Sequence, residues 1–73
     1  MSEQPVIDNR GLQPPEPMLR ILAALEELAP GAVLVALNDR QPLLLYPQLE
    51  EMGCRHSTEA LAGGGFRITI TRA

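Results

Sequence analysis

The sequence predicts an α/β (α+β) two-layer sandwich in which two helices cover one face of a mixed four-stranded sheet. Helical and strand patterns follow one another in the order β-α-β-α-β-β along the 73 residues. The apolar run 32–37 lies between turn signals, which is typical of a buried strand central in its sheet. Residues 66–71 alternate between apolar and polar side chains, as expected for a strand with one buried face.

The chain opens with a strand and a loop. Residues 5–8 have a short strand pattern, and 9–15 form a loop in which Gly11 is free to adopt a positive φ. Pro15 and Pro17 suit the first turn of a helix, because N–H groups in that turn have no partner within the helix.

An amphipathic helix follows this loop. From Met18 onward, apolar residues recur every three or four positions until Pro-Gly at 30–31 ends the helix. The apolar stripe consists of Met18, Ile21, Leu22, Leu25, Leu28 and Ala29, and the positions away from it include Arg20, Ala24 and Glu27.

The middle of the chain reads as a strand and a second helix. The apolar strand 32–37 is followed by the polar turn 38–42 and by a helix over about 44–52. Pro47 leaves two starts open for this helix, one near residue 44 and one at Tyr46.

The last two strands form an antiparallel hairpin. Strands 54–61 and 66–71 are joined by the glycine turn 63–65, whereas the first β-α-β unit requires parallel pairing. The second face of the sheet is expected to stay open, which matches the polar alternation of these strands. The inward side chains are Phe66, Ile68 and Ile70, and the outward ones are Arg67, Thr69 and Thr71.

Length and composition indicate one small domain, 1–73, with a flexible polar tail at 1–4. Hydrophobic residues make up 45% of the chain, the net charge is −3, and lysine is absent. Nucleic acid is not an expected partner, because neutralising phosphates needs an excess of Lys and Arg. The sequence has neither a signal-peptide pattern nor an apolar run that would span a membrane, so a cytoplasmic protein without a membrane partner is expected.

The start of the first helix carries a family resemblance. Residues 8–17 read Asp-Asn-Arg-Gly-Leu-Gln-Pro-Pro-Glu-Pro before the amphipathic helix. This pattern resembles the opening of the TusA/SirA-like sulfur-carrier proteins, whose signature is a strand, Gly-Leu-x-Cys-Pro-x-Pro and a helix. The resemblance covers nearly the whole chain and implies the TusA-like fold. At Pro14 the carriers have their sulfur-carrying cysteine, so the chain looks closest to an uncharacterised bacterial sister group that lacks it.

The loops after the first two strands hold the candidate site. They leave the sheet at the same edge, and ligands of open α/β sheets bind beyond the carboxyl ends of parallel strands. We therefore expect a partner-binding or ligand-binding site there. The alternative is a site without a ligand, in which Asp39 caps its turn and Arg10 bridges to Glu16 or Asp39. The candidate residues are Arg10, Gly11, Pro14, Pro15, Glu16, Pro17, Asn38, Asp39 and Arg40.

Cys54 is the single cysteine, so a disulfide within the chain is excluded. It is a possible reactive thiol, or a small structural residue at the start of its strand. With His56 it would present two metal ligands on one face, and a metal site would also need Asp39 or Glu59. The alternative is a polar pair on a strand.

The function expected from these features is that of a non-catalytic interaction or regulatory module. Its partner would be another protein, and no cofactor is indicated. Two alternatives remain open: a sulfur-transfer protein that uses Cys54, and a sensor of a metal or small anion. The apolar residues Met18, Leu19 and Leu22 fit either a docking stripe or core packing.

Overall fold

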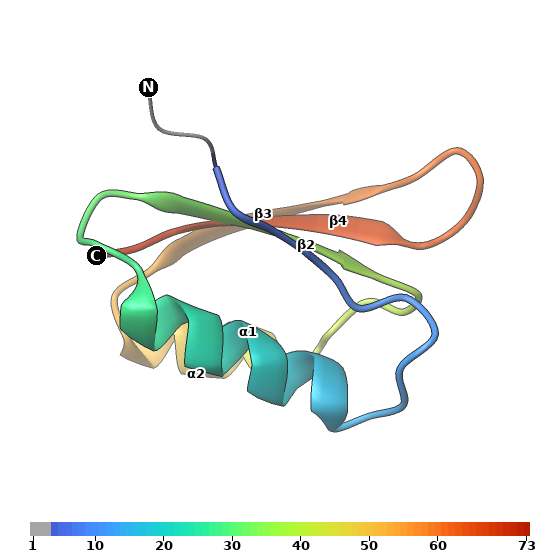
Figure 1. Ribbon diagram of the computed structural model, residues 1–73, viewed down its shortest axis with the longest axis horizontal. Coiled ribbons are helices and arrows are strands. Elements are labelled where there is room, and N and C mark those ends of the chain that lie inside the picture. Colours follow the sequence, from blue (N-terminus) through green and yellow to red (C-terminus); the bar gives the residue numbers. More distant parts are fainter. Residues whose placement is uncertain (1–3) are drawn as a thin grey trace.

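Two helices lie against one face of a four-stranded sheet (Figure 1). The computed structural model describes residues 4–73. The predicted fold class and element order are confirmed. Of the predicted tail, residues 1–3 lie outside the described residues, and Gln4 is exposed ahead of the first strand. The elements are β1 (Val6–Asp8), α1 (Glu16–Glu27), β2 (Val33–Asn38), α2 (Leu45–Glu51), β3 (Arg55–Ala60) and β4 (Phe66–Thr71).

The sheet has the strand order β1-β2-β4-β3. β1 and β2 pair in parallel, with Val6 opposite Val35. β4 lies between β2 and β3 and is antiparallel to both. The parallel first unit, the central position of β2 and the final hairpin are thus confirmed. Because β1 and β2 are parallel neighbours, their carboxyl ends meet at one edge of the sheet, where the next two loops begin.

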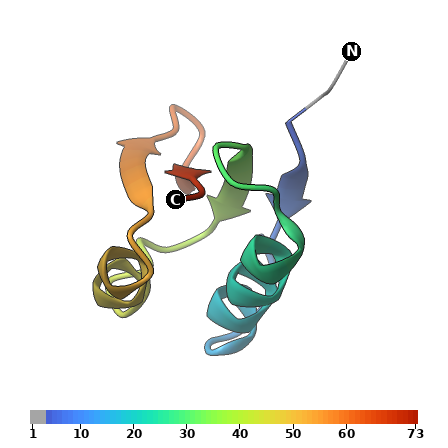
Figure 2. The ribbon, with the colours of Figure 1, turned by 90° about the vertical axis from the view of Figure 1, so that its left-hand side faces the viewer.

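Figure 2 shows both helices on one side of the sheet, and the core is made by side chains of these two layers. Each large aliphatic side chain that is fully buried there stabilises the fold by about 1.5–3 kcal/mol. The two helices contribute residues one turn apart, which places them on the same helix face. The fully buried aliphatic residues are Ile21 and Leu25 of α1, Leu45 and Leu49 of α2, and Leu34, Ala36, Ile68 and Ile70 of the sheet.

β4 has the predicted bounds, and the other elements differ from their predicted bounds by at most three residues. β2 runs one residue later at both ends, because Asn38 still pairs with β4. α1 ends at Glu27, and the backbone of Leu28 is extended, with φ −85° and ψ 134°. Ala29 therefore leaves the predicted stripe and is exposed, whereas Ala24 packs against the core. α2 begins between its two predicted starts, and β3 is one residue shorter at each end.

The second face of the sheet is open over the described part of the chain, because both helices lie on the other face (Figure 2). The polar residues of β4 lie on this open face, as predicted. β2 adds a half-buried apolar row beside them, since Val33, Val35 and Leu37 are register partners of those residues. Neither helix within residues 4–73 is long and apolar enough to cross a membrane.

Candidate functional site

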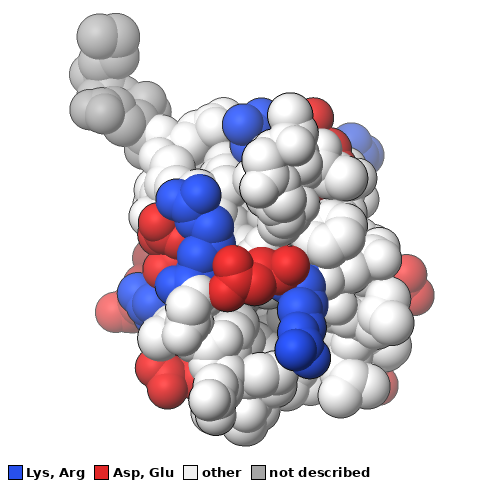
Figure 3. Space-filling model, turned by 90° about the vertical axis from the view of Figure 1, so that its right-hand side faces the viewer, with Lys and Arg blue, Asp and Glu red and all other residues white. Residues whose placement is uncertain are grey.

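A cavity of about 740 Å³ opens where β1 and β2 end and the two helices begin. One wall comes from the loop between β1 and α1, and the other from the loop between β2 and α2. Prolines and leucines make eight of the fifteen lining residues, and most of the polar side chains come from the end of β2 and the turn after it. The space-filling view of this end shows a hollow below a row of alternating positive and negative side chains (Figure 3). The lining residues are 11–15, Pro17, Met18 and 38–45.

Seven of the nine predicted site residues line this cavity, so the predicted convergence of the two loops is what the structure has. Two of the nine do not line it, namely Arg10 and Glu16, which are exposed beside it. The seven are Gly11, Pro14, Pro15, Pro17, Asn38, Asp39 and Arg40.

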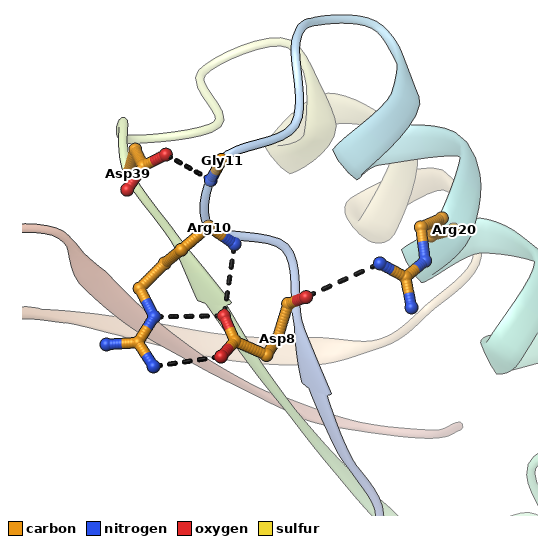
Figure 4. A network of polar contacts seen from close by, with 5 residues as sticks. All are labelled: Asp8, Arg10, Gly11, Arg20 and Asp39. Carbon is orange, nitrogen blue, oxygen red and sulfur yellow. Dashed lines mark hydrogen bonds and ion pairs between the residues drawn. The ribbon is translucent and has the colours of Figure 1, made fainter.

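One short hydrogen bond joins the two loops. The backbone N–H of Gly11 donates to Asp39 Oδ2 at 2.6 Å (Figure 4). Gly11 has a φ of +87°, a conformation that favours glycine over residues with a Cβ. Asp39 therefore accepts from the neighbouring loop, which differs from the expectation that it caps its own turn. The contact holds the rim of the cavity together.

Arg10 folds back onto the end of β1. Its Nε and Nη2 donate to the two carboxylate oxygens of Asp8 at 2.9 and 2.8 Å, and its backbone N–H also donates to Asp8 Oδ1 (Figure 4). Arg20 of α1 reaches the backbone carbonyl of Asp8 at 3.4 Å. The expected bridge from Arg10 to Glu16 or Asp39 is therefore wrong, because Asp8 offers a two-pronged acceptor only two residues away.

The Asp8 carboxylate has a shifted pKa. The side-chain hydrogen bonds from Arg10, followed by the bond from its backbone N–H, lower the pKa of Asp8 from 3.8 to about 2. The Asp8 carboxylate in turn raises the pKa of Arg10. Both groups stay charged over the physiological pH range, so this pair is a fixed part of the rim and does not act as a pH switch.

Arg10→Ala should raise the pKa of Asp8 from about 2 toward 3.8, because the side-chain hydrogen bonds that favour the carboxylate are lost. Carboxyl carbon chemical shifts followed by NMR during acid titration measure this change. Since the folded-state pKa is the lower one, the stabilisation from Asp8 is present above pH 3.8 and is lost as pH falls toward 2. Arg40→Ala serves as the control and should leave this titration unchanged. An unaltered Asp8 curve in Arg10→Ala would contradict the assignment.

A buried asparagine pair fixes the two strand ends that carry the loops. Asn9 and Asn38 are 1% and 3% exposed. Asn9 Nδ2 donates to Asn38 Oδ1 at 3.1 Å and to the Pro17 carbonyl at 3.3 Å. Within residues 4–73 no donor reaches Asn9 Oδ1. Asn9 was missed as a site residue. The signal for it is a short polar residue directly after an apolar strand, at the position that Asn38 occupies in β2.

The cavity wall offers little for acid–base or nucleophilic chemistry. Among the described residues that line it, Asp39 and Arg40 are the only titratable ones. Cys54 is 6% exposed and lies outside the lining. His56 stacks on Tyr46, with ring centroids 4.9 Å apart. The part of the chain that the structure describes holds no group of three or more His, Cys, Asp or Glu suited to a metal ion.

The apolar stripe at the start of α1 divides between two roles. Met18 and Leu22 pack against the core, and Met18 also reaches the cavity. Leu19 is 56% exposed and contributes to neither. Core packing therefore accounts for two of the three residues.

The comparisons agree with this architecture. The family described as "Uncharacterized conserved protein (DUF2249)" matches residues 6–72. The fold is similar to the crystal structure of a SirA-like protein from Desulfitobacterium hafniense, with a TM-score of 0.82 and 30% sequence identity. That match covers 90% of this chain and 93% of the other. No curated protein matches the chain. The predicted SirA-like fold is thereby confirmed.

Proposed function

This chain belongs to the DUF2249 family of uncharacterized conserved proteins, and we propose that it is a non-catalytic module that binds a partner protein through its cavity. The observation that carries the proposal is the makeup of the cavity wall. Pro14 stands in that wall where the resemblance to sulfur carriers implies a thiol, and proline has no nucleophile. The fold has a cavity at this edge of the sheet, and the residues that line it are suited to non-covalent binding rather than to nucleophilic chemistry.

The exposed apolar residues of the second wall support docking of a protein. Leu43 and Leu44 are 65% and 78% exposed and lie side by side in the loop before α2. Exposed apolar groups around a hollow are typical of protein interaction sites. Arg40 is the only cation among the described lining residues, whereas the Asp39 carboxylate already accepts a hydrogen bond from the Gly11 N–H. The partner that fits is therefore an apolar side chain flanked by a carboxylate.

A photo-crosslinking residue at position 44 should capture one specific partner protein in cells of the source organism. The matched control carries the same residue at position 19, because Leu19 is also an exposed leucine but lies outside the cavity. Arg40→Glu should abolish the crosslink from position 44. It replaces the cation that faces the partner's carboxylate by a second carboxylate, and the two negative charges repel each other. Identical products from both positions, or a crosslink that survives Arg40→Glu, would contradict the docking site.

The sulfur-transfer alternative is tested by intact mass. Incubation with a cysteine desulfurase and cysteine should leave the wild-type mass unchanged, because Cys54 is 6% exposed and its thiol is shielded. The matched positive control is Pro14→Cys, which restores a thiol at the position implied by the resemblance and should gain sulfur. A gain of one sulfur atom by the wild type, lost in Cys54→Ser, would overturn the non-catalytic proposal.

A further inference from the structure

β3 forms a long open edge of the sheet. At the opposite edge β1 has only three residues and follows Pro5, which has no N–H to offer a neighbouring strand. β3 has six residues without proline, and within residues 4–73 it pairs on one side only, with β4. Figure 2 shows α2 beneath β3, on the helix-bearing face. Such an edge presents unpaired backbone groups to another strand.

The hydrogen bonds at the hairpin identify which backbone groups of β3 are unpaired. Leu61 N–H donates to the Gly65 carbonyl at 3.0 Å, in the same register as the β3–β4 pairs. The direction of backbone hydrogen bonding alternates along an antiparallel strand. The N–H and C=O groups of residues 55, 57 and 59 therefore point toward β4, and those of residues 56, 58 and 60 point to the open edge.

The charges on β3 are complementary to themselves. Arg55 is exposed and forms no ion pair with any residue in 4–73. Glu59 Oε1 accepts a hydrogen bond from Arg67 Nη1 at 2.8 Å, whereas Glu59 Oε2 has no donor among residues 4–73. Arg55 and Glu59 lie on the same face of the strand, two residues on either side of Ser57. Antiparallel pairing of two copies around Ser57 places Arg55 of each copy opposite Glu59 of the other.

We propose that the chain forms a symmetric homodimer in which the β3 strands of two copies pair antiparallel around Ser57. In this register His56 lies opposite Thr58 of the second copy. Both residues have outward backbone groups, so each such pair exchanges two hydrogen bonds. Sliding the copies by two residues in either direction puts Ser57 opposite a charged residue and removes both ion pairs. The charges therefore select one register.

The dimer joins the two sheets edge to edge and leaves the cavities free. A twofold axis perpendicular to the sheet keeps the helices of both copies on one face. It also reverses the strand direction, so that the two cavities lie at opposite ends of the dimer. The proposal does not depend on what the cavity binds. Charged residues on edge strands usually discourage pairing with another strand. Here Arg55 and Glu59 carry opposite charges and each lies opposite the other in a second copy, so they favour pairing.

Sedimentation velocity tests the association. We expect a reversible monomer–dimer equilibrium between about 10 µM and 1 mM, because one pair of edge strands makes a small interface and small interfaces form weak complexes. Arg55→Glu and Glu59→Arg should each weaken dimerisation at least about tenfold, since both ion pairs become like-charge contacts. An equimolar mixture of the two variants should associate again, because each variant supplies the charge that the other lacks. Arg40→Glu changes the net charge as Arg55→Glu does, and should dimerise like the wild type.

Amide hydrogen exchange identifies the surface that pairs. The amides of His56 and Thr58 should become protected as the protein concentration rises, and those of Ser57 and Glu59 should be protected throughout. Dimers without added protection at His56 and Thr58 would overturn the proposal, because another surface would then be in contact. A chain that stays monomeric to about 1 mM would overturn it as well. Exchange in the wild type decides the question even if Glu59→Arg folds poorly.

Discussion

Ile68→Ala should destabilise the fold by about 2–5 kcal/mol, which is the cost of deleting a fully buried aliphatic side chain. Ile68 is 0% exposed in β4, where it lies between Ala36 of β2 and Thr58 of β3. A domain of this length has a free energy of unfolding of only about 4–11 kcal/mol. The variant should therefore lose a large fraction of its free energy of unfolding.

Urea denaturation followed by far-UV circular dichroism measures this loss. The matched control is Ile68→Val, which removes one methylene and should cost about 0.5–1.5 kcal/mol. If both variants unfold at the wild-type urea midpoint, Ile68 does not pack as the structure has it. A large loss in Ile68→Ala with a small loss in Ile68→Val confirms tight packing at the centre of the sheet.

Asn9→Ala should destabilise the fold by about 1–3 kcal/mol, because it leaves one buried and one partly buried acceptor without their donor. These acceptors are Asn38 Oδ1 and the carbonyl of Pro17, at the end of β2 and in the first turn of α1. Asn38→Ala should cost less, since Asn9 then keeps its bond to Pro17. The same denaturation experiment measures both variants.

The double variant Asn9→Ala/Asn38→Ala measures the energetic coupling between the two asparagines. Residues in direct contact couple by about 0.5–3 kcal/mol, so the double variant should lose less than the sum of the single losses. Strictly additive losses would show that the two amides do not depend on each other. Because Asn38 also lines the cavity, a coupled pair means that the cavity wall and the strand ends are held by one contact.

The elements and their order were predictable because each follows from a local pattern. The alternation in β4 identifies its buried face, and the run in β2 predicts a strand with neighbours on both sides. The meeting of the two loops was also predictable, since parallel neighbouring strands end at the same edge of the sheet. Seven of the nine candidate residues reach the cavity for that reason.

The individual contacts of the site were not predictable in the same way. The sequence offers Arg10 several acidic residues as partners, and only the path of the loop decides that it pairs with Asp8. The position of Asn9 directly after a strand marks it in the sequence, but this signal does not separate a buried amide from an exposed turn residue. Its burial depends on where α1 begins, because the carbonyl of Pro17 is one of its acceptors.

The sequence by itself determined the layers of this protein, the edge of the sheet at which its candidate site lies, and the absence of a nucleophilic side chain at Pro14. Apolar periodicity and the chemistry of a single residue carry that information locally. Only the tertiary structure decided the Asp8–Arg10 pair, the Asn9–Asn38 contact, the shape of the cavity and the open edge at β3. The Asp8–Arg10 pair depends on the path of the loop after β1. The other three features depend on distances between residues far apart in the chain, which exist only once the helices have packed against the sheet.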